Sequence, residues 1–106
     1  MAGQCYQDDP DNRLLDQIFI DKENNCPEKC QSKCRKLGYK YAGVQNGEGC
    51  HCGNEAPPES KIVSFSECKV KCSGDNGLIC GASSRMNVFT VDKRTGRQRL
   101  NINEFF

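Results

Sequence analysis

The chain has 106 residues, of which nine are cysteine and 36% are hydrophobic, and its mean hydropathy is −0.74. A single domain of this kind buries a thin apolar core, so the cysteines are expected to form a disulfide scaffold in an oxidising compartment. The net charge of +1 argues against a nucleic-acid partner, and no apolar run approaches the ~20 residues of a membrane span.

The positions of the cysteines also argue against a zinc site and against a signal peptide at the start of the sequence. The C-x3-C and C-x-C pairs, with His51 as the single histidine, fit zinc poorly, so neither a metal nor a cofactor is expected. No signal peptide precedes Cys5. The sequence is therefore expected to be a mature segment that is secreted or belongs to the extracellular part of a membrane protein.

The first elements in the chain are short. Residues 4–7 are predicted to form a strand, and residues 8–12, rich in Asp, Asn and Pro, a turn. Asp8 and Asp9 are expected to be solvated caps of this turn. The apolar stretch 13–20 fits either a strand or an irregular segment.

A helix is predicted from Pro27 to about Leu37. Proline suits the first helical position, and Gly38 suits the left-handed residue that follows a helix end. Cys30 and Cys34 are four residues apart, so they share one face of this helix.

A β-hairpin is predicted next. Residues 39–45 alternate aromatic and small residues, which places Tyr39 and Tyr41 on one face of a strand. Asn46-Gly47 is a strong signal for a two-residue hairpin turn.

The return strand of this hairpin covers residues 49–53, with Cys50 and Cys52 pointing inward and His51 outward. A helix face with two thiols and a strand face with two thiols can be joined by two parallel disulfides. This is the central structural prediction from the sequence.

The second half of the chain is less regular. Residues 54–61 are expected to be a loop, and the S-x-x-E pattern at 64–67 predicts a second short helix with Cys68 and Cys72 on one face. Residues 86–91 alternate apolar and polar side chains, which predicts a closing strand. Residues 93–106 are expected to be a flexible basic tail or linker.

Six short motifs together resemble the WSC domain, which occurs in fungal cell-wall stress sensors, Kremen-type and polycystin-type receptors and xylosyltransferases. The motifs are CYQD at 5–8, PEKC at 27–30, GYKYAG at 38–43, CHCGN at 50–54, CSG at 72–74 and ICG at 79–81. The resemblance covers residues 3–92. It implies an extracellular module, usually described as carbohydrate-binding, whose small sheet is packed with helices as in PAN/apple domains.

The expected fold is thus a small disulfide-rich α+β domain, with a short antiparallel sheet and two short helices. The family's eight cysteines correspond to all but Cys26. The expected disulfides are Cys5–Cys68, Cys30–Cys50, Cys34–Cys52 and Cys72–Cys80. The facing helix and strand favour Cys30–Cys50 and Cys34–Cys52, and the swapped pairing within these four cysteines stays open. Cys72–Cys80 closes a short loop, which leaves Cys5 and Cys68 to pair with each other.

Cys26 departs from the family pattern. It occupies the expected helix N-cap, where a thiol caps poorly. Three fates remain open for it: a free thiol, a disulfide to a second chain that gives a linked dimer, or a disulfide to a cysteine elsewhere in a parent protein.

The leading functional hypothesis is weak, non-catalytic binding of a polysaccharide or glycoprotein glycan. No nucleophile and base are paired in the sequence, so an enzyme is not expected. Sugar sites combine an aromatic platform with planar polar side chains, and Tyr39, Tyr41 and His51 are expected to share the outer face of the hairpin. The candidate binding residues are Tyr6, Asp9, Arg13, Tyr39, Tyr41, Gln45, Asn46, Glu48, His51 and Asn54.

The alternative is a protein-interaction module of a receptor or of a secreted signalling factor. Its surface would use the loops at residues 8–20 and 54–62, because function concentrates in loops. No partner protein is identified by the sequence.

Overall fold

The computed structural model describes residues 3–91, so the tail expected at 93–106 lies outside the described residues. The strands are β1 (Gln4–Gln7), β2 (Gln17–Ile20), β3 (Tyr41–Gln45), β4 (Gly49–Gly53), β5 (Lys71–Cys72), β6 (Asp75–Ile79) and β7 (Arg85–Thr90), the helix is α1 (Pro27–Lys36), and two 3-10 turns cover Glu59–Lys61 and Phe65–Glu67. None of the helices among the described residues is long and apolar enough to cross a membrane.

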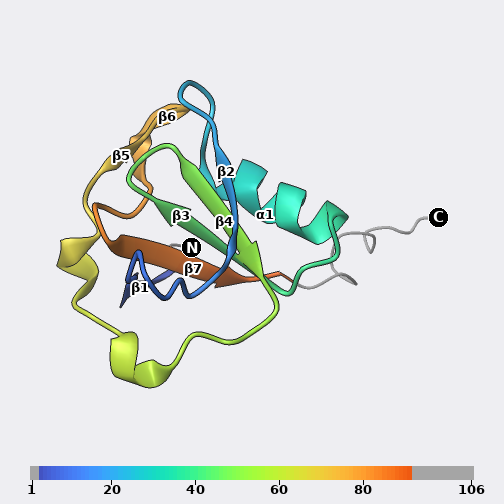
Figure 1. Ribbon diagram of the computed structural model, residues 1–106. Coiled ribbons are helices and arrows are strands. Elements are labelled where there is room, and N and C mark those ends of the chain that lie inside the picture. The colour runs from blue at the N-terminus through green and yellow to red at the C-terminus, as the bar shows by residue number, and fades with distance from the viewer. Residues whose placement is uncertain (1–2, 92–106) are drawn as a thin grey trace.

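The centre of the domain is a five-stranded antiparallel sheet in the order β1-β7-β3-β4-β2 (Figure 1). A separate ribbon pairs β5 with β6. The expected strands near both ends of the domain are present as β1 and β7, and the second half of the ambiguous stretch 13–20 forms β2. The expected class, a small disulfide-rich α+β domain, is confirmed.

The β3–β4 hairpin turns at Asn46 and Gly47, whose φ angles are 53° and 80°. Two consecutive residues with positive φ are what Asn-Gly favours, so the position of the turn is confirmed. Gln45 pairs with Gly49, so the loop has three residues, 46–48, instead of the expected two. Strand β3 begins at Tyr41 rather than at the expected Tyr39.

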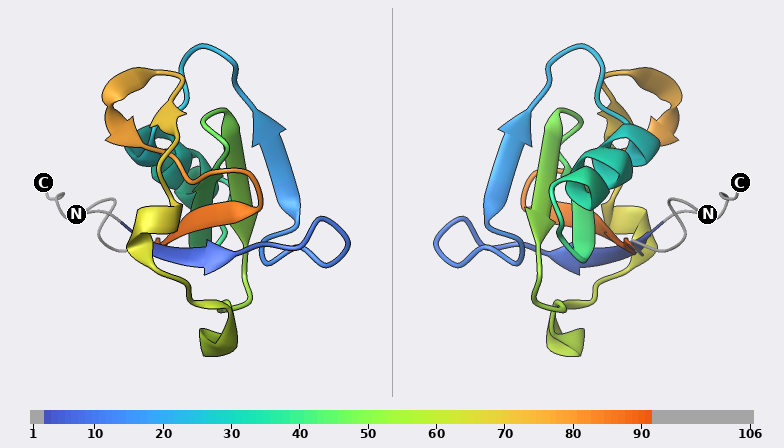
Figure 2. Two further views of the ribbon diagram at one scale, coloured as in Figure 1. Left: turned by 90° about the vertical axis from the view of Figure 1, so that its left-hand side faces the viewer. Right: turned by 90° about the vertical axis from the view of Figure 1, so that its right-hand side faces the viewer.

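Helix α1 lies across one face of the sheet (Figure 2). Disulfides Cys30–Cys50 and Cys34–Cys52 join it to β4, with Cα–Cα separations of 5.4 Å in both pairs. All four cysteines are buried in one apolar cluster that includes small side chains of β3. The predicted pairing of a helix face with a strand face is confirmed.

The opposite face of the sheet carries a second buried cluster, formed by Leu15, Met86 and Val88. Tyr6 and Tyr41 pack against this cluster and are partly buried. The loop that holds Leu15 therefore covers part of the face that α1 leaves open.

The prediction of a second short helix is wrong. Only a single 3-10 turn, Phe65–Glu67, follows the Ser64 cap, and Cys72 lies on β5 instead of on a helix. After Cys68 the chain becomes extended because Val70 exchanges main-chain hydrogen bonds with residues 80 and 81, both at 2.8 Å.

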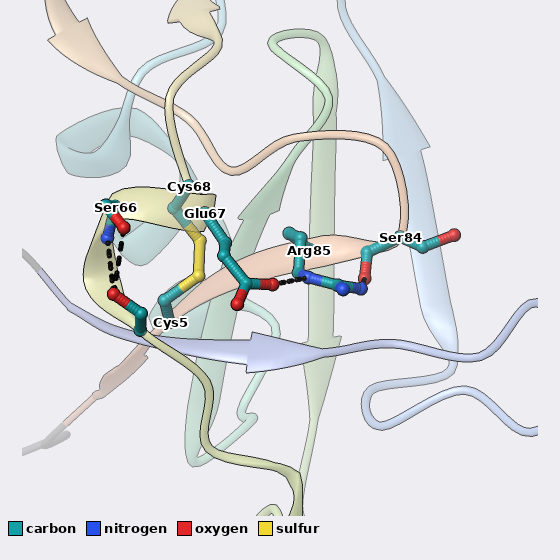
Figure 3. A network of polar contacts seen from close by, with 7 residues as sticks. Cys5, Ser66, Glu67, Cys68, Ser84 and Arg85 are labelled. Atoms are coloured by element: carbon teal, nitrogen blue, oxygen red, sulfur yellow. Dashed lines mark hydrogen bonds and ion pairs between the residues drawn. A yellow bond between two sulfur atoms is a disulfide. The ribbon is translucent and has the colours of Figure 1, made fainter.

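Two further contacts fix this 3-10 turn to the sheet (Figure 3). The disulfide Cys5–Cys68 ties it to β1, and Glu67 Oε1 accepts a hydrogen bond from Arg85 Nε of β7 at 2.6 Å. The fourth disulfide joins Cys72 to Cys80, only eight residues apart in sequence. All four expected disulfides are thus present.

Candidate functional site

A pocket of about 180 Å³ lies beside the turn of the β3–β4 hairpin, on the face of the sheet away from α1. Two stretches that are distant in sequence form it: strand β2 with the loop before it, and the hairpin. We call it the tip pocket; its lining residues are Arg13, Ile18, Ile20, Gln45, Asn46, Glu48, Gly49 and His51.

Strand alternation puts Gln45 and His51 into this pocket. Ala42 and Val44 of β3 face the helix with the disulfides, so Gln45 faces the other way, and His51 lies between the two helix-facing cysteines of β4. Gln45 is 8% exposed and His51 is 3% exposed. Gln45 Oε1 and His51 Nδ1 are buried without a hydrogen-bond partner among the described residues.

Buried polar atoms nearly always have partners in folded proteins, so two unpartnered atoms beside one pocket are unusual. Each costs free energy in the empty domain. Both atoms are closed to solvent, so a ligand in the tip pocket must displace a neighbouring side chain to supply those hydrogen bonds and recover that cost.

An ion pair fixes one wall of the tip pocket. Arg13 Nη1 lies 2.7 Å from Oδ2 of Asp8, whose side chain is fully buried. Oδ1 of the same carboxylate accepts the Leu14 N–H at 2.9 Å. The expectation that Asp8 is solvated is wrong, because its neighbours in the loop fold over it, whereas Asp9 is exposed and accepts the Asp11 N–H at 2.9 Å.

The base of the hairpin turn is fixed from the other side. Asn25, which is buried, donates from Nδ2 to the carbonyl oxygens of Gly47 and Gly49 at 3.2 and 3.1 Å. The segment before α1 therefore sets the position of the turn that carries Asn46 and Glu48, both of which are exposed at the pocket rim.

Burial lowers the pKa of His51 below its ordinary value of 6.5. The Asp8 carboxylate opposes this shift, as does the main chain of Leu15 beside the ring, and the Arg13 charge adds to it. The Leu15 contact does not have the geometry of a hydrogen bond to Nδ1. The imidazole is therefore neutral at neutral pH, with one nitrogen as a donor and the other as an acceptor.

Five of the ten candidate residues line the tip pocket: Arg13, Gln45, Asn46, Glu48 and His51. His51 faces away from the helix as expected, but it is buried instead of exposed. Asp9 lies on the exposed turn before β2.

The tyrosines do not form the expected platform. Tyr39 precedes β3 and packs against the disulfide cluster, whereas Tyr41 packs against the second cluster on the other side of the sheet. The prediction that both face one way is wrong, because the strand starts only at Tyr41. Tyr6 packs against the same second cluster as Tyr41, and Asn54 accepts the Lys40 N–H at 3.1 Å at the far end of the hairpin.

Sequence reasoning missed three side chains that shape this site. Asp8 acts by anchoring Arg13, and Ile18 and Ile20 form the apolar wall, being 42% and 61% exposed. The signal that was available is the alternation in QIFI at 17–20, which puts two isoleucines on one strand face.

Cys26 occupies the N-cap of α1 and makes no capping hydrogen bond through its side chain. It is half-buried, packs against the disulfide cluster, and is unpaired within residues 3–91. Its fate in a larger assembly stays a prediction.

A family model described as the WSC domain matches residues 3–82. The chain belongs to the WSC domain family. The resemblance inferred from the cysteine motifs is confirmed. WSC domains occur in extracellular regions of proteins and are small non-catalytic modules.

Curated relatives of this WSC domain come from animals and fungi. It is 41% identical over 86 residues to Xylosyltransferase oxt of Drosophila melanogaster, covering 80% of this chain and 10% of that protein. It is 36% identical over 89 residues to a WSC domain-containing protein of Arthroderma benhamiae, covering 84% and 12%. A putative fungistatic metabolite of Chaetomium globosum is 33% identical over 60 residues, covering 57% and 27%.

The chain thus spans about a tenth of the length of the first two relatives. The match to the xylosyltransferase covers only the WSC region of that protein.

Proposed function

We propose that this WSC domain is a non-catalytic glycan-binding module and that the tip pocket is its binding site. The observation that carries the proposal is the pair of buried, unpartnered atoms, Gln45 Oε1 and His51 Nδ1. Leaving such an atom unpaired costs about 1–3 kcal/mol. A ligand that supplies both partners recovers part of this free energy on binding.

A sugar hydroxyl suits both atoms. It donates one hydrogen bond and accepts two, so one hydroxyl can donate to Gln45 Oε1 while it accepts from His51 Nδ1 in the tautomer that carries the proton there. At the rim, Arg13 supplies charged donors and Glu48 a charged acceptor, which a neighbouring hydroxyl of the same sugar can use.

The apolar wall suits the C–H face of a sugar ring. Ile18 and Ile20 are both exposed and both line the pocket. Because no tyrosine or phenylalanine among the described residues lines the pocket, and because its volume of about 180 Å³ is small, we expect weak binding of one sugar unit at a time. Useful affinity then requires several domains on one polymer.

The test is retention of the oxidised chain on β-1,3-glucan, chitin, xylan and mannan, each as an insoluble polymer, with the reduced chain beside it. The key variant is Gln45→Met, which keeps the length of the side chain and removes the unpartnered oxygen. The matched control is Gln17→Met, the same change on exposed β2 outside the pocket.

We expect one polymer class to retain the wild type and Gln17→Met but not Gln45→Met. Because the methionine buries no unpaired polar atom, we expect Gln45→Met to fold at least as stably as the wild type. Equal retention of all three proteins would mean that water alone fills the tip pocket. Loss of retention in Tyr39→Ala, with Gln45→Met unaffected, would move the site to the other end of the hairpin.

A further inference from the structure

Strand β2 forms one edge of the five-stranded sheet, and no strand among residues 3–91 pairs with its outer side (Figure 2). Its sequence, QIFI, contains no charge and no proline. Natural sheets usually protect an open edge with charges, proline or a bulge, because an unprotected edge pairs with other chains. The β2 edge lacks these protections within the strand.

The register of β2 shows which main-chain groups are free. The Asp21 N–H donates to the Glu48 carbonyl oxygen at 2.9 Å, which marks this pair as hydrogen-bonded. Hydrogen-bonded pairs alternate along an antiparallel ladder, so Phe19 also bonds to β4. Ile18 and Ile20 therefore direct their N–H and C=O groups to the open edge.

A groove of about 470 Å³ runs between β2 and α1, on the side of the sheet opposite the tip pocket. Lys29 and Lys33 of α1 line it. Both lysines are exposed, and neither forms an ion pair within the described part of the chain.

Two contacts define the charge of this groove. Lys33 Nζ lies 4.5 Å from the centroid of the Phe19 ring, which places its ammonium group directly beside β2. Asp21 is the one carboxylate in the lining, and its Oδ1 already accepts the N–H groups of Glu23 and Asn24 at 3.2 and 2.9 Å. The groove therefore has an excess of positive charge.

We propose that the β2 edge binds an extended acidic segment of another protein, which adds to the sheet as an outer strand. Alternate side chains of an added strand point to opposite faces. Carboxylates on one face would meet Lys29 and Lys33, and apolar side chains on the other would pack on Ile18 and Ile20. Strand addition of this kind draws its affinity from the main chain and its specificity from alternate side chains.

The charges favour this occupant over a second copy of the domain. Strand β2 of a second copy would bring four uncharged residues to the edge, and the strand itself contains no carboxylate for Lys29 or Lys33. The free N–H and C=O groups at Ile18 and Ile20 suit any extended main chain, so the two lysines make the distinction. The inference rests on different observations from the proposed glycan function, since the lysines lie on the other side of the sheet, but both sites share Ile18 and Ile20.

The test uses the oxidised 106-residue chain labelled with ¹⁵N and a capped nonapeptide of alternating Glu and Val as the probe. We expect the largest amide shifts at Ile18 and Ile20, and slower hydrogen exchange of both amides when the peptide is bound. A nonapeptide of alternating Lys and Val is the control peptide and should leave β2 unchanged.

Two kinds of variant locate the contact. Lys29→Glu with Lys33→Glu should weaken binding about tenfold or more, whereas Lys36→Glu with Lys69→Glu, equal in charge but outside the groove, should have little effect. Ile18→Pro removes one outward N–H without touching a bond to β4 and should also abolish binding.

Several results overturn the proposal. These are no shift in β2, equal binding of both peptides, or full binding by the Lys29/Lys33 variant. Broadening of the β2 amides that grows with protein concentration, together with a dimeric mass, would assign the edge to a second copy. If mass analysis shows that Ile18→Pro lacks its disulfides, the lysine variants decide, because both lysines are exposed and should not affect folding.

Discussion

Asp8 and Arg13 connect the tip pocket to the core of the domain. The Arg13 guanidinium, on a side chain that is 30% exposed, contacts a carboxylate that is completely buried. The main chain of Asp8 is also fixed, because its N–H donates to the Ser84 carbonyl oxygen at 3.0 Å. One loop residue therefore positions both the pocket wall and the main chain of the loop.

Asp8→Asn should destabilise the domain by about 1–3 kcal/mol, because it removes the charge that pairs with Arg13 but leaves an acceptor for the Leu14 N–H. Denaturant unfolding measures the change, and retention on the polysaccharide should fall with it. Asp9→Asn is the control, since this neighbour is exposed, and it should stay within about 0.5 kcal/mol of the wild type. Equal losses of unfolding free energy in the two variants would show that Asp8 has no structural role beyond that of an exposed residue.

His51 should make the domain less stable in mild acid. Its folded-state pKa lies below 6.5 because of burial, so below pH 6.5 the unfolded chain takes up a proton before the folded domain does. The contribution of His51 is therefore present above 6.5 and is lost as the pH falls from 6.5 towards the folded-state pKa.

The midpoint of thermal unfolding, followed from neutral pH down to about pH 5, measures this effect above the range where most carboxylates titrate. His51→Gln removes the titrating group and should show a flatter dependence. Identical pH curves for the two proteins would mean that another group controls the acid response.

The two outer disulfides should differ in their contribution to stability. Cys5–Cys68 spans 63 residues and Cys72–Cys80 spans 8. The loop-entropy relation gives about 4 kcal/mol for the longer loop and about 2.5 kcal/mol for the shorter one. Replacing each pair by alanines should therefore destabilise the domain more for Cys5 and Cys68, as measured in urea. A larger loss for the short loop would indicate that native contacts at β5 and β6 dominate.

The parts of the fold that follow from local spacing were predictable. The Asn46-Gly47 turn and the pairing of helix and strand cysteines each depend on residues close together in sequence. The prediction of a second helix was wrong because the capping pattern that suggested it is local, whereas the observed conformation is set by contacts with residues distant in sequence. Cys68 is held by Cys5, and Val70 pairs with residues 80 and 81, so distant contacts draw the chain into an extended form.

The candidate site was predicted in part for the same reason. Alternation alone puts His51 on the face away from the helix, but its burial depends on the loop that holds Arg13 and Leu15, which no local pattern places beside it. The predicted tyrosine platform does not form because β3 begins two residues later than expected, which leaves Tyr39 outside the strand. That shift of two residues is within the usual uncertainty of an element boundary.

Cys26 offers a change that should stabilise the domain. It occupies the N-cap of α1 in an extended conformation, with φ −160° and ψ 163°, and forms no side-chain cap. Serine is among the preferred N-cap residues and favours just this extended backbone, so its hydroxyl can accept an N–H of the first turn. Cys26→Ser should therefore raise the free energy of unfolding by about 0.5–1 kcal/mol.

Cys26→Ala separates the cap from the loss of the thiol, because both variants remove the half-buried sulfur and only serine can cap. We expect the serine variant to be more stable than the alanine variant in denaturant unfolding. Intact mass after alkylation without reductant reports the state of the wild-type thiol, and one modified site on a monomer would exclude a dimer linked through Cys26. Equal stability of the two variants would show that the first turn of α1 gains nothing from a side-chain cap.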